Sequence, residues 1–223
     1  MTDFSQSGIL QSNFLQSGRQ DAPFHVILAH GAGAPMTSPF MEVFAALLAE
    51  RDIAVSRFEF AYMAARREGG KRRPPPKAES LEREYGDAIT ALRETLAPSQ
   101  KLFIGGKSLG GRVASMVAGA AFDAGKIAGL ICLGYPFHPP GKPDQLRTAH
   151  LETLTCPTLI VQGVRDPFGS RLDVAGLDLA QTISFLWAED GDHDLGPRGA
   201  SGFTRKGNLT AGADAVAAFM AKA

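Results

Sequence analysis

A serine between two glycines is the residue of this chain best suited to act as a nucleophile. Ser108 lies in the segment Gly-Lys-Ser-Leu-Gly (residues 106–110), after the apolar residues 102–104 and before a stretch rich in alanine and valine. This pattern predicts a strand, a tight turn and a helix, with the serine hydroxyl exposed on a strained turn. Glycine is expected on both sides because side chains there would collide with the neighbouring strand and helix.

A phosphate-binding loop is the alternative interpretation of the same residues. Its pattern, Gly-x-x-x-x-Gly-Lys-Ser, shares the Gly-Lys-Ser of residues 106–108 but also needs a glycine five positions before Gly106. That position is Lys101, so we exclude a phosphate-binding loop. A short Gly/Ser pattern also arises by chance, and the nucleophile interpretation therefore depends on groups supplied by other segments.

Two later segments supply an acid and a base. Asp166 and His193 each come shortly after an apolar run of strand length. The carboxyl ends of parallel strands meet at one edge of a sheet, so we expect both residues to lie near Ser108. His193 would take the proton of the serine hydroxyl, and Asp166 would fix the tautomer of the imidazole. Asp173 and Asp178 are the alternative acids, but they lie beyond the loop position expected of the acid.

The aspartates around the histidine allow a second interpretation, a metal-binding loop. Asp190, Asp192 and Asp194 surround His193, but the rest of a calcium-loop pattern is missing. We therefore expect no metal and no cofactor, and we interpret Asp192 and Asp194 as solvated loop charges.

Two backbone N–H groups are expected to stabilise the negative charge that develops on an attacked carbonyl oxygen. One belongs to Leu109, directly after the serine, and the other to Ala32 in the first glycine-rich loop. Gly31 and Gly33 would let this loop approach the reacting atoms closely. His30 is expected to orient the loop rather than to react.

Bulky residues in loops at the same edge are the expected lining of a substrate pocket. They are Tyr62, Met63, Phe137, His138 and Phe168. Packing of the loops against one another is the alternative role for these side chains.

The elements that would position these groups follow from the hydrophobic pattern. Strands are expected at residues 24–30, 53–60, 102–104, 127–135, 158–162 and 183–188, and helices at 38–50, 80–96 and 208–221. The most central strands are apolar throughout, as is typical of strands covered on both faces. We therefore expect an α/β fold with a mostly parallel central sheet and helices on both faces, in a single domain over residues 1–223. Residues 1–23 are weakly patterned and allow a short hairpin around Gly18.

The overall composition excludes several classes of partner. The 223 residues contain 23 Lys or Arg and 23 Asp or Glu, so no net charge directs the chain to nucleic acid or to a membrane. No apolar run approaches the ~20 residues of a membrane span, and the first residues do not form a secretory signal. The two cysteines, Cys132 and Cys156, lie in or beside predicted strands, which favours a reduced state and a cytoplasmic location.

One segment departs from this neutral balance. Residues 66–77 contain six Lys or Arg and one Glu. A solvated loop is the simplest interpretation, and a docking site for an anionic substrate or an acidic partner is the alternative.

These motifs resemble those of the α/β-hydrolase superfamily, in which nucleophile, acid and histidine follow in the order Ser, Asp, His. The chain most resembles a small, cap-less, poorly characterised bacterial hydrolase family related to testis-expressed and chromatin-complex subunit proteins of animals. Dienelactone-hydrolase-like enzymes are more distant relatives. The resemblance rests on residues 30–33, 106–112, 134–141 and 191–193.

The resemblance implies an α/β-hydrolase fold without a large cap domain. It also implies a serine hydrolase that cleaves a small ester or thioester through an acyl-enzyme. The alternative from a different class is a non-catalytic adaptor that binds an acidic partner through residues 66–77. The intact set of Ser108, Asp166 and His193 favours the enzyme, because a scaffold has no need of all three.

Overall fold

The computed structural model describes residues 14–67, 69 and 74–223. In this part of the chain seven strands form one sheet, with the spatial order β1-β3-β2-β4-β5-β6-β7. They are β1 (Leu15–Ser17), β2 (Phe24–Ala29), β3 (Ile53–Phe58), β4 (Lys101–Lys107), β5 (Gly129–Leu133), β6 (Thr158–Gly163) and β7 (Ile183–Ala188). Every neighbouring pair is parallel except β1 and β3, which confirms the expected sheet.

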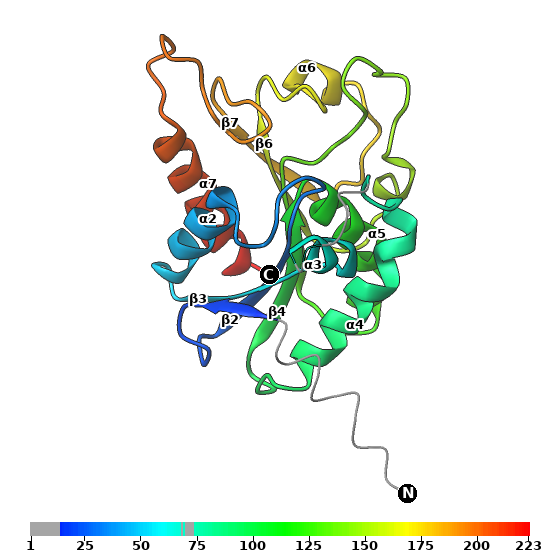
Figure 1. Cartoon of the computed structure of the whole chain (residues 1–223), viewed down its shortest axis with the longest axis vertical. Coiled ribbons are helices and arrows are strands. Elements are labelled where there is room, and N and C mark those ends of the chain that lie inside the picture. Colours follow the sequence, from blue (N-terminus) through cyan, green and yellow to red (C-terminus); the bar gives the residue numbers. More distant parts are fainter. Residues whose placement is uncertain (1–13, 68, 70–73) are drawn as a thin grey trace, which may run out of the picture.

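Helices cover both faces of this sheet (Figure 1). They are α2 (Pro39–Ala49), α3 (Ala61–Arg67), α4 (Glu82–Arg93), α5 (Leu109–Asp123), α6 (Arg171–Val174) and α7 (Arg205–Met220), with 3-10 turns at Ala78–Leu81 and Ala149–Leu151. Buried side chains of α4 and α5 form one core with the sheet, and those of α2 and α7 form another on the opposite face. The predicted α/β architecture is therefore confirmed.

The central strands show why the apolar runs are continuous. Successive side chains of a strand point to opposite faces, so a strand between two helical layers needs apolar residues at every position. In β4, Ile104 belongs to the core under α4 and α5, whereas its neighbour Phe103 packs on the side of α2 and α7. Ile27 and Leu28 divide between the two cores in the same way in β2.

The structure corrects two expectations near the N-terminus and the basic segment. No hairpin forms around Gly18 in the described part of residues 1–23, because β1 pairs antiparallel with β3 rather than with the next strand; residues 1–13 lie outside the described residues. The basic segment does not begin as a loop, because Arg66 and Arg67 form the last residues of α3. Its residues 68 and 70–73, which include Lys71, Arg72 and Arg73, also lie outside the described residues.

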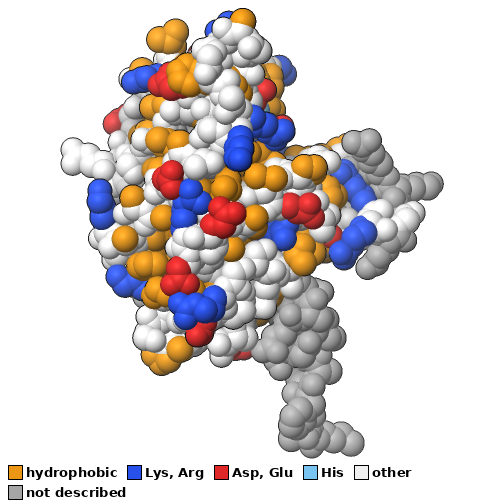
Figure 2. Space-filling view, turned by 90° about the vertical axis from the view of Figure 1, so that its left-hand side faces the viewer, with side chains coloured by type: hydrophobic (Ala, Val, Ile, Leu, Met, Phe, Trp, Pro, Cys, Tyr) orange, Lys and Arg blue, Asp and Glu red, His pale blue; other side chains and the backbone are white. Residues whose placement is uncertain are grey.

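The surface over α2 and α7 carries charges of both signs. Figure 2 shows Lys and Arg interspersed with Asp and Glu on this face, in agreement with the neutral composition. Among the helices that the structure describes, none is long and apolar enough to cross a membrane.

Candidate active site

Ser108 lies at the turn between β4 and α5 in a strained backbone conformation. Its φ of 51° and ψ of −114° are unusual for a residue with a side chain. A Cβ atom added at Gly106 would lie 2.5 Å from the carbonyl oxygen of Ala29 in β2, and one added at Gly110 would lie still closer to the same oxygen. The close approach of β2 therefore requires both glycines, as the sequence predicts. The turn leaves Ser108 lining two cavities at the carboxyl edge of the sheet.

The structure brings His193 and Asp166 together. The Nδ1 atom of His193 lies 2.8 Å from Oδ2 of Asp166, whose side chain is fully buried. A carboxylate only accepts hydrogen bonds, so Nδ1 carries the proton and Nε2 of the neutral imidazole is left as an acceptor. His193 also lines the smaller of the two cavities beside Ser108, with a volume of about 490 Å³. Asp173 instead caps α6 through Ser170.

Two neighbours fix the Asp166 carboxylate. The backbone N–H of Phe168 donates to Oδ1 at 2.8 Å, and the side-chain amide of Gln162 donates to Oδ2 at 3.0 Å. The Gln162 amide is itself fully buried at the end of β6, and its oxygen accepts from the backbone N–H of Tyr135 at 2.7 Å. Gln162 was not among the site residues predicted from the sequence. Its signal was a polar side chain at the end of an otherwise apolar strand.

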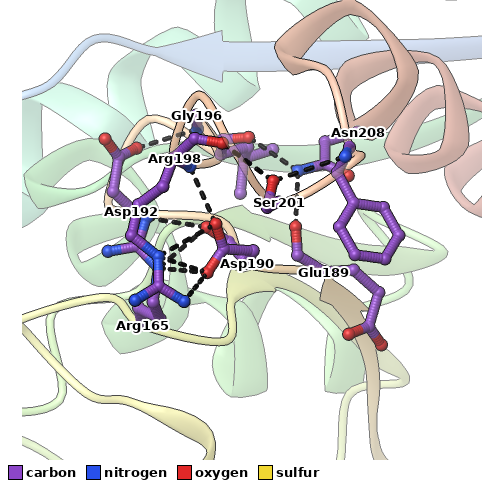
Figure 3. Close-up of polar contacts among 10 residues, drawn as sticks. Arg165, Glu189, Asp190, Asp192, Gly196, Arg198, Ser201 and Asn208 are labelled. Atoms are coloured by element: carbon purple, nitrogen blue, oxygen red, sulfur yellow. Dashed lines mark hydrogen bonds and ion pairs between the residues drawn. The ribbon is translucent and has the colours of Figure 1, made fainter.

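An ion-pair network fixes the loop that contains His193 (Figure 3). The Asp190 carboxylate contacts the guanidinium groups of both Arg165, at 2.7 Å, and Arg198, at 2.6 Å. Hydrogen bonds from Arg198 to this carboxylate, together with both positive charges, keep the pKa of Asp190 well below its usual range. The loop that begins at Asp190 is therefore tied to the loop after β6, which also contains Asp166.

Asp192 is more than a solvated loop charge, which corrects the expectation from the sequence. Although the residue is exposed, its Oδ1 accepts hydrogen bonds from the backbone N–H groups of Asp194 at 2.9 Å and Gly196 at 2.8 Å. Figure 3 shows the Asp192 carboxylate beside Gly196. Its charge thus stabilises the turn directly after His193. Within the described ranges, no group of three or more His, Cys, Asp or Glu side chains is arranged to bind a metal.

Lys107 supplies a further contact to the histidine loop. Its Nζ donates to the backbone carbonyl oxygen of His193 at 2.8 Å and lies 3.3 Å from the carboxylate of Asp194. Only 8% of the lysine side chain is exposed. Burial lowers its pKa, and the nearby carboxylates of Asp194 and Asp166 oppose this effect. Lys107 was considered in the sequence only as part of a phosphate-binding loop, so its role in positioning His193 was missed.

His30 orients the glycine-rich loop that contains Ala32. The backbone N–H of Phe60 donates to Nε2 of His30 at 3.1 Å, so the proton resides on Nδ1, which donates to the carbonyl oxygen of Gly31 at 2.7 Å. Burial lowers the pKa of His30, which favours this neutral form. The Tyr62 hydroxyl adds a hydrogen bond of 3.2 Å to the carbonyl oxygen of Ala32.

Among the described residues, the linings of these two cavities include one of the five expected pocket residues, and a pocket role of the other four stays a prediction. Phe168 lines both cavities and packs against the His193 ring at a centroid distance of 4.3 Å. Tyr62 supports the Ala32 loop, whereas Met63, Phe137 and His138 are buried away from both cavities as the structure describes them. Loop packing, the alternative role for these residues, explains this burial: the Phe137 ring meets the Tyr135 ring edge to face, with a centroid distance of 4.8 Å.

The two cavities differ in their linings. We call the smaller one the histidine-side cavity; His193, Lys107 and Phe40 line it. The larger one, the arginine-side cavity, has a volume of about 860 Å³ and contains Leu109, Arg112, Arg147 and residues 75–79. Ser108, Ala32 and Phe168 line both.

Comparisons with known proteins agree with this architecture. A sequence model of the alpha/beta hydrolase domain family matches residues 22–221. An alpha-beta serine hydrolase homologue from Coxiella burnetii is 17% identical, with a TM-score of 0.65 over 92% of this chain and 89% of the other. Dienelactone hydrolase from Anabaena variabilis is 20% identical, with a TM-score of 0.66 over 93% and 89%. Est1E from Butyrivibrio proteoclasticus, solved with bound ferulic acid, is 16% identical, with a TM-score of 0.66 over 94% of each chain.

Proposed function

The chain belongs to the alpha/beta hydrolase family, as the match over residues 22–221 shows, and from this membership we propose that it is a serine hydrolase acting on a small ester or thioester. One observation carries the proposal. A buried Asp166 carboxylate accepts a hydrogen bond of 2.8 Å from Nδ1 of His193, and His193 lines the same cavity as Ser108. This pairing leaves Nε2 of the histidine free to act as a base toward the serine.

The reaction begins when the Ser108 hydroxyl attacks the ester carbonyl and His193 Nε2 accepts its proton. The resulting imidazolium is stabilised by the negative charge of Asp166. Negative charge on the former carbonyl oxygen is stabilised by the backbone N–H groups of Leu109 and Ala32. The Leu109 N–H is suited to this role because the first N–H groups of α5 have no partner within the helix.

Collapse of the tetrahedral intermediate breaks the bond to the leaving alcohol or thiol. His193 donates its proton to that leaving group, and the acyl group remains on Ser108. A water molecule then attacks the acyl carbon while His193 accepts its proton; the bond to the Ser108 oxygen breaks, His193 returns the proton to that oxygen, and the carboxylic acid is released. Because the leaving group must reach the histidine, we place it in the histidine-side cavity and the acyl group in the arginine-side cavity.

Two finer inferences from the sequence belong to this proposal. The kinship with the bacterial family related to testis-expressed and chromatin-complex subunit proteins stays a prediction. A cytoplasmic location also stays a prediction, supported by Cys132 and Cys156, which are both buried and free of disulfides.

Hydrolysis of a panel of 4-nitrophenyl esters and acyl thioesters tests the proposal. We expect His193→Ala and Asp166→Asn to lose most of the activity, with losses of up to ~10⁴-fold typical of such groups. Asp173→Asn is the matched control, since this carboxylate caps α6 instead, and it should retain activity. Loss of activity in Asp173→Asn but not in Asp166→Asn would show that the acid is misassigned. No turnover of any ester or thioester by the wild type would favour a non-catalytic adaptor.

A further inference from the structure

Two arginines lie in the arginine-side cavity close to Ser108. Arg112 belongs to α5, and its backbone N–H donates to the carbonyl oxygen of Ser108 at 3.0 Å, one helical turn earlier. Arg147 comes from the loop after β5, and its backbone N–H donates to the carbonyl oxygen of Phe137 at 2.8 Å. Both side chains line the same cavity as Ser108 and Leu109.

The positive charge in this cavity exceeds the negative charge. The guanidinium of Arg112 donates to Glu79 Oε1 at 2.8 Å, but its buried Nε has no hydrogen-bond partner in the described part of the chain. Among the described residues of the lining, Glu79 is the one acidic residue, against Arg112, Arg147 and Lys77. The basic segment of residues 66–77 therefore contributes its last residue, Lys77, to the cavity.

Arg147 is a cation of this cavity without a direct ionic partner among the described residues. Its side chain is half-buried, and it makes no hydrogen bond or ion pair with any residue that the structure describes. Burial lowers its pKa, the positive charge of Arg112 adds to this effect, and the negative charge of Glu79 opposes it. A half-buried guanidinium is costly unless an anion compensates it. The fork of N–H donors of an arginine matches a carboxylate particularly well.

We propose that the substrate is a monoester or monothioester of a dicarboxylic acid, whose free carboxylate binds Arg147 with support from Arg112. This inference rests on the proposed serine hydrolase function. It places the carboxylate on the acyl group rather than on the leaving group, because the leaving group must face His193 in the other cavity. Arg112 lies one helical turn after Ser108, and Arg147 lines the same cavity, so we choose a six-carbon dicarboxylic acyl group as the probe.

Matched esters of 4-nitrophenol test this substrate class. The monoester of adipic acid and the neutral hexanoate have the same number of acyl carbons and differ in the terminal carboxylate. We expect the wild type to prefer the adipate monoester in kcat/KM. Arg147→Gln should lower the ratio of the two kcat/KM values by about tenfold or more, as expected for loss of a charge-assisted hydrogen bond. This ratio does not depend on the fraction of the variant that is folded.

Lys126→Gln is the control for a simple change of net charge. Lys126 is exposed and lies three residues beyond the C-terminal end of α5, the end away from Ser108, and its loss should leave the ratio unchanged. A third ester, with hexanoate as acyl group and 4-hydroxybenzoate as leaving group, carries the carboxylate on the other side. An equal effect of Arg147→Gln on both anionic esters would overturn the placement on the acyl group.

A measurement on the wild type alone provides a second test. Free adipate should inhibit hydrolysis of the neutral ester competitively and more strongly than hexanoate, and equal inhibition would overturn the inference. The inference would also be overturned if Arg147→Gln left the ratio of the two kcat/KM values unchanged. If hydrolysis still depended on Ser108 in that case, the proposed function would remain intact. Hydrolysis that persists in Ser108→Ala would instead refute the proposed function, and this inference with it.

Discussion

Replacement of Gly134 by alanine tests whether the position of the loop that contains His193 controls activity. Gly134 follows β5 with a φ of +63°. A Cβ atom there would lie 2.9 Å from the carbonyl oxygen of His193 and 3.1 Å from Nζ of Lys107, the two atoms that form a hydrogen bond of 2.8 Å. The new methyl group would therefore push directly against the contact that fixes His193.

The structure sets the size of the expected effect. An ordinary contact of this kind is 3.4 Å or longer, so the carbonyl of His193 must move by about half an ångström. Misplacement of a reacting group by 1 Å can cost ~10²-fold in rate, and half of that displacement corresponds to a loss of about tenfold in kcat/KM. The left-handed conformation adds a stability cost of about 1–2 kcal/mol, which leaves a typical domain folded.

Gly125→Ala is the matched control. Gly125 has nearly the same φ, +66°, but it lies just after α5 with nothing within 4 Å of an added Cβ. We expect both variants to lose similar free energy of unfolding, measured by urea denaturation, and only Gly134→Ala to lose activity toward 4-nitrophenyl hexanoate. Equal kcat/KM values for the two variants would refute the reasoning that a close approach at Gly134 positions His193.

Two further predictions concern buried titratable side chains. Lys107→Met should lower kcat/KM by roughly ten- to a hundredfold, the cost of a lost hydrogen bond from a charged donor. Asp194→Asn should change kcat/KM less than about threefold, because 59% of that side chain is exposed. Equal losses of kcat/KM in Lys107→Met and Asp194→Asn would show that the ion pair, rather than the hydrogen bond to His193, causes the effect. Burial lowers the pKa of His25 to about 4 from its usual 6.5, so its neutral form stabilises the fold above pH 6.5. Roughly 3 kcal/mol of the free energy of unfolding should be lost as the pH falls from 6.5 to 4. Urea denaturation at several pH values should show that His25→Gln loses this pH dependence. An unchanged pH dependence in His25→Gln would contradict the attribution to His25.

The sheet could be predicted from the sequence because its pattern is unusually simple. Strands buried on both faces contain an uninterrupted apolar run, such as residues 26–29 of β2 and 159–161 of β6, where all of these residues are buried. Polar residues directly after such strands must then gather at one edge. The proximity of Asp166 to His193 follows from this rule, because β6 and β7 are parallel neighbours.

The supporting contacts could not be predicted because they depend on packing between distant segments. Lys107 meets the carbonyl of a residue 86 positions later, and nothing in the local pattern specifies that contact. Phe137 follows a strand at the expected edge, yet its ring packs against Tyr135 and Phe185 in the core. Position after a strand therefore indicates the edge of the sheet but not whether a side chain faces the cavity.

A capping residue in the sequence, Thr204, marks the start of α7 more accurately than the hydrophobic pattern does. The expected helix started at residue 208, whereas α7 begins at Arg205. The Thr204 hydroxyl accepts a hydrogen bond from the backbone N–H of Gly207 at 3.0 Å and so caps the helix. The hydrophobic pattern alone could not locate this start, because the first turn of the helix is polar and exposed.

Covalent labelling of Ser108 by a fluorophosphonate tests the central claim most directly. Such a probe reacts only with a serine whose hydroxyl is activated by a neighbouring base, as proposed for Ser108 with His193 and Asp166. Peptide mapping by mass spectrometry should find the phosphonate adduct on Ser108 of the wild type, none on Ser108→Ala, and greatly slowed labelling of His193→Ala. A wild-type protein that stays unlabelled, or an adduct that persists in Ser108→Ala, would contradict the assignment of Ser108 as the nucleophile.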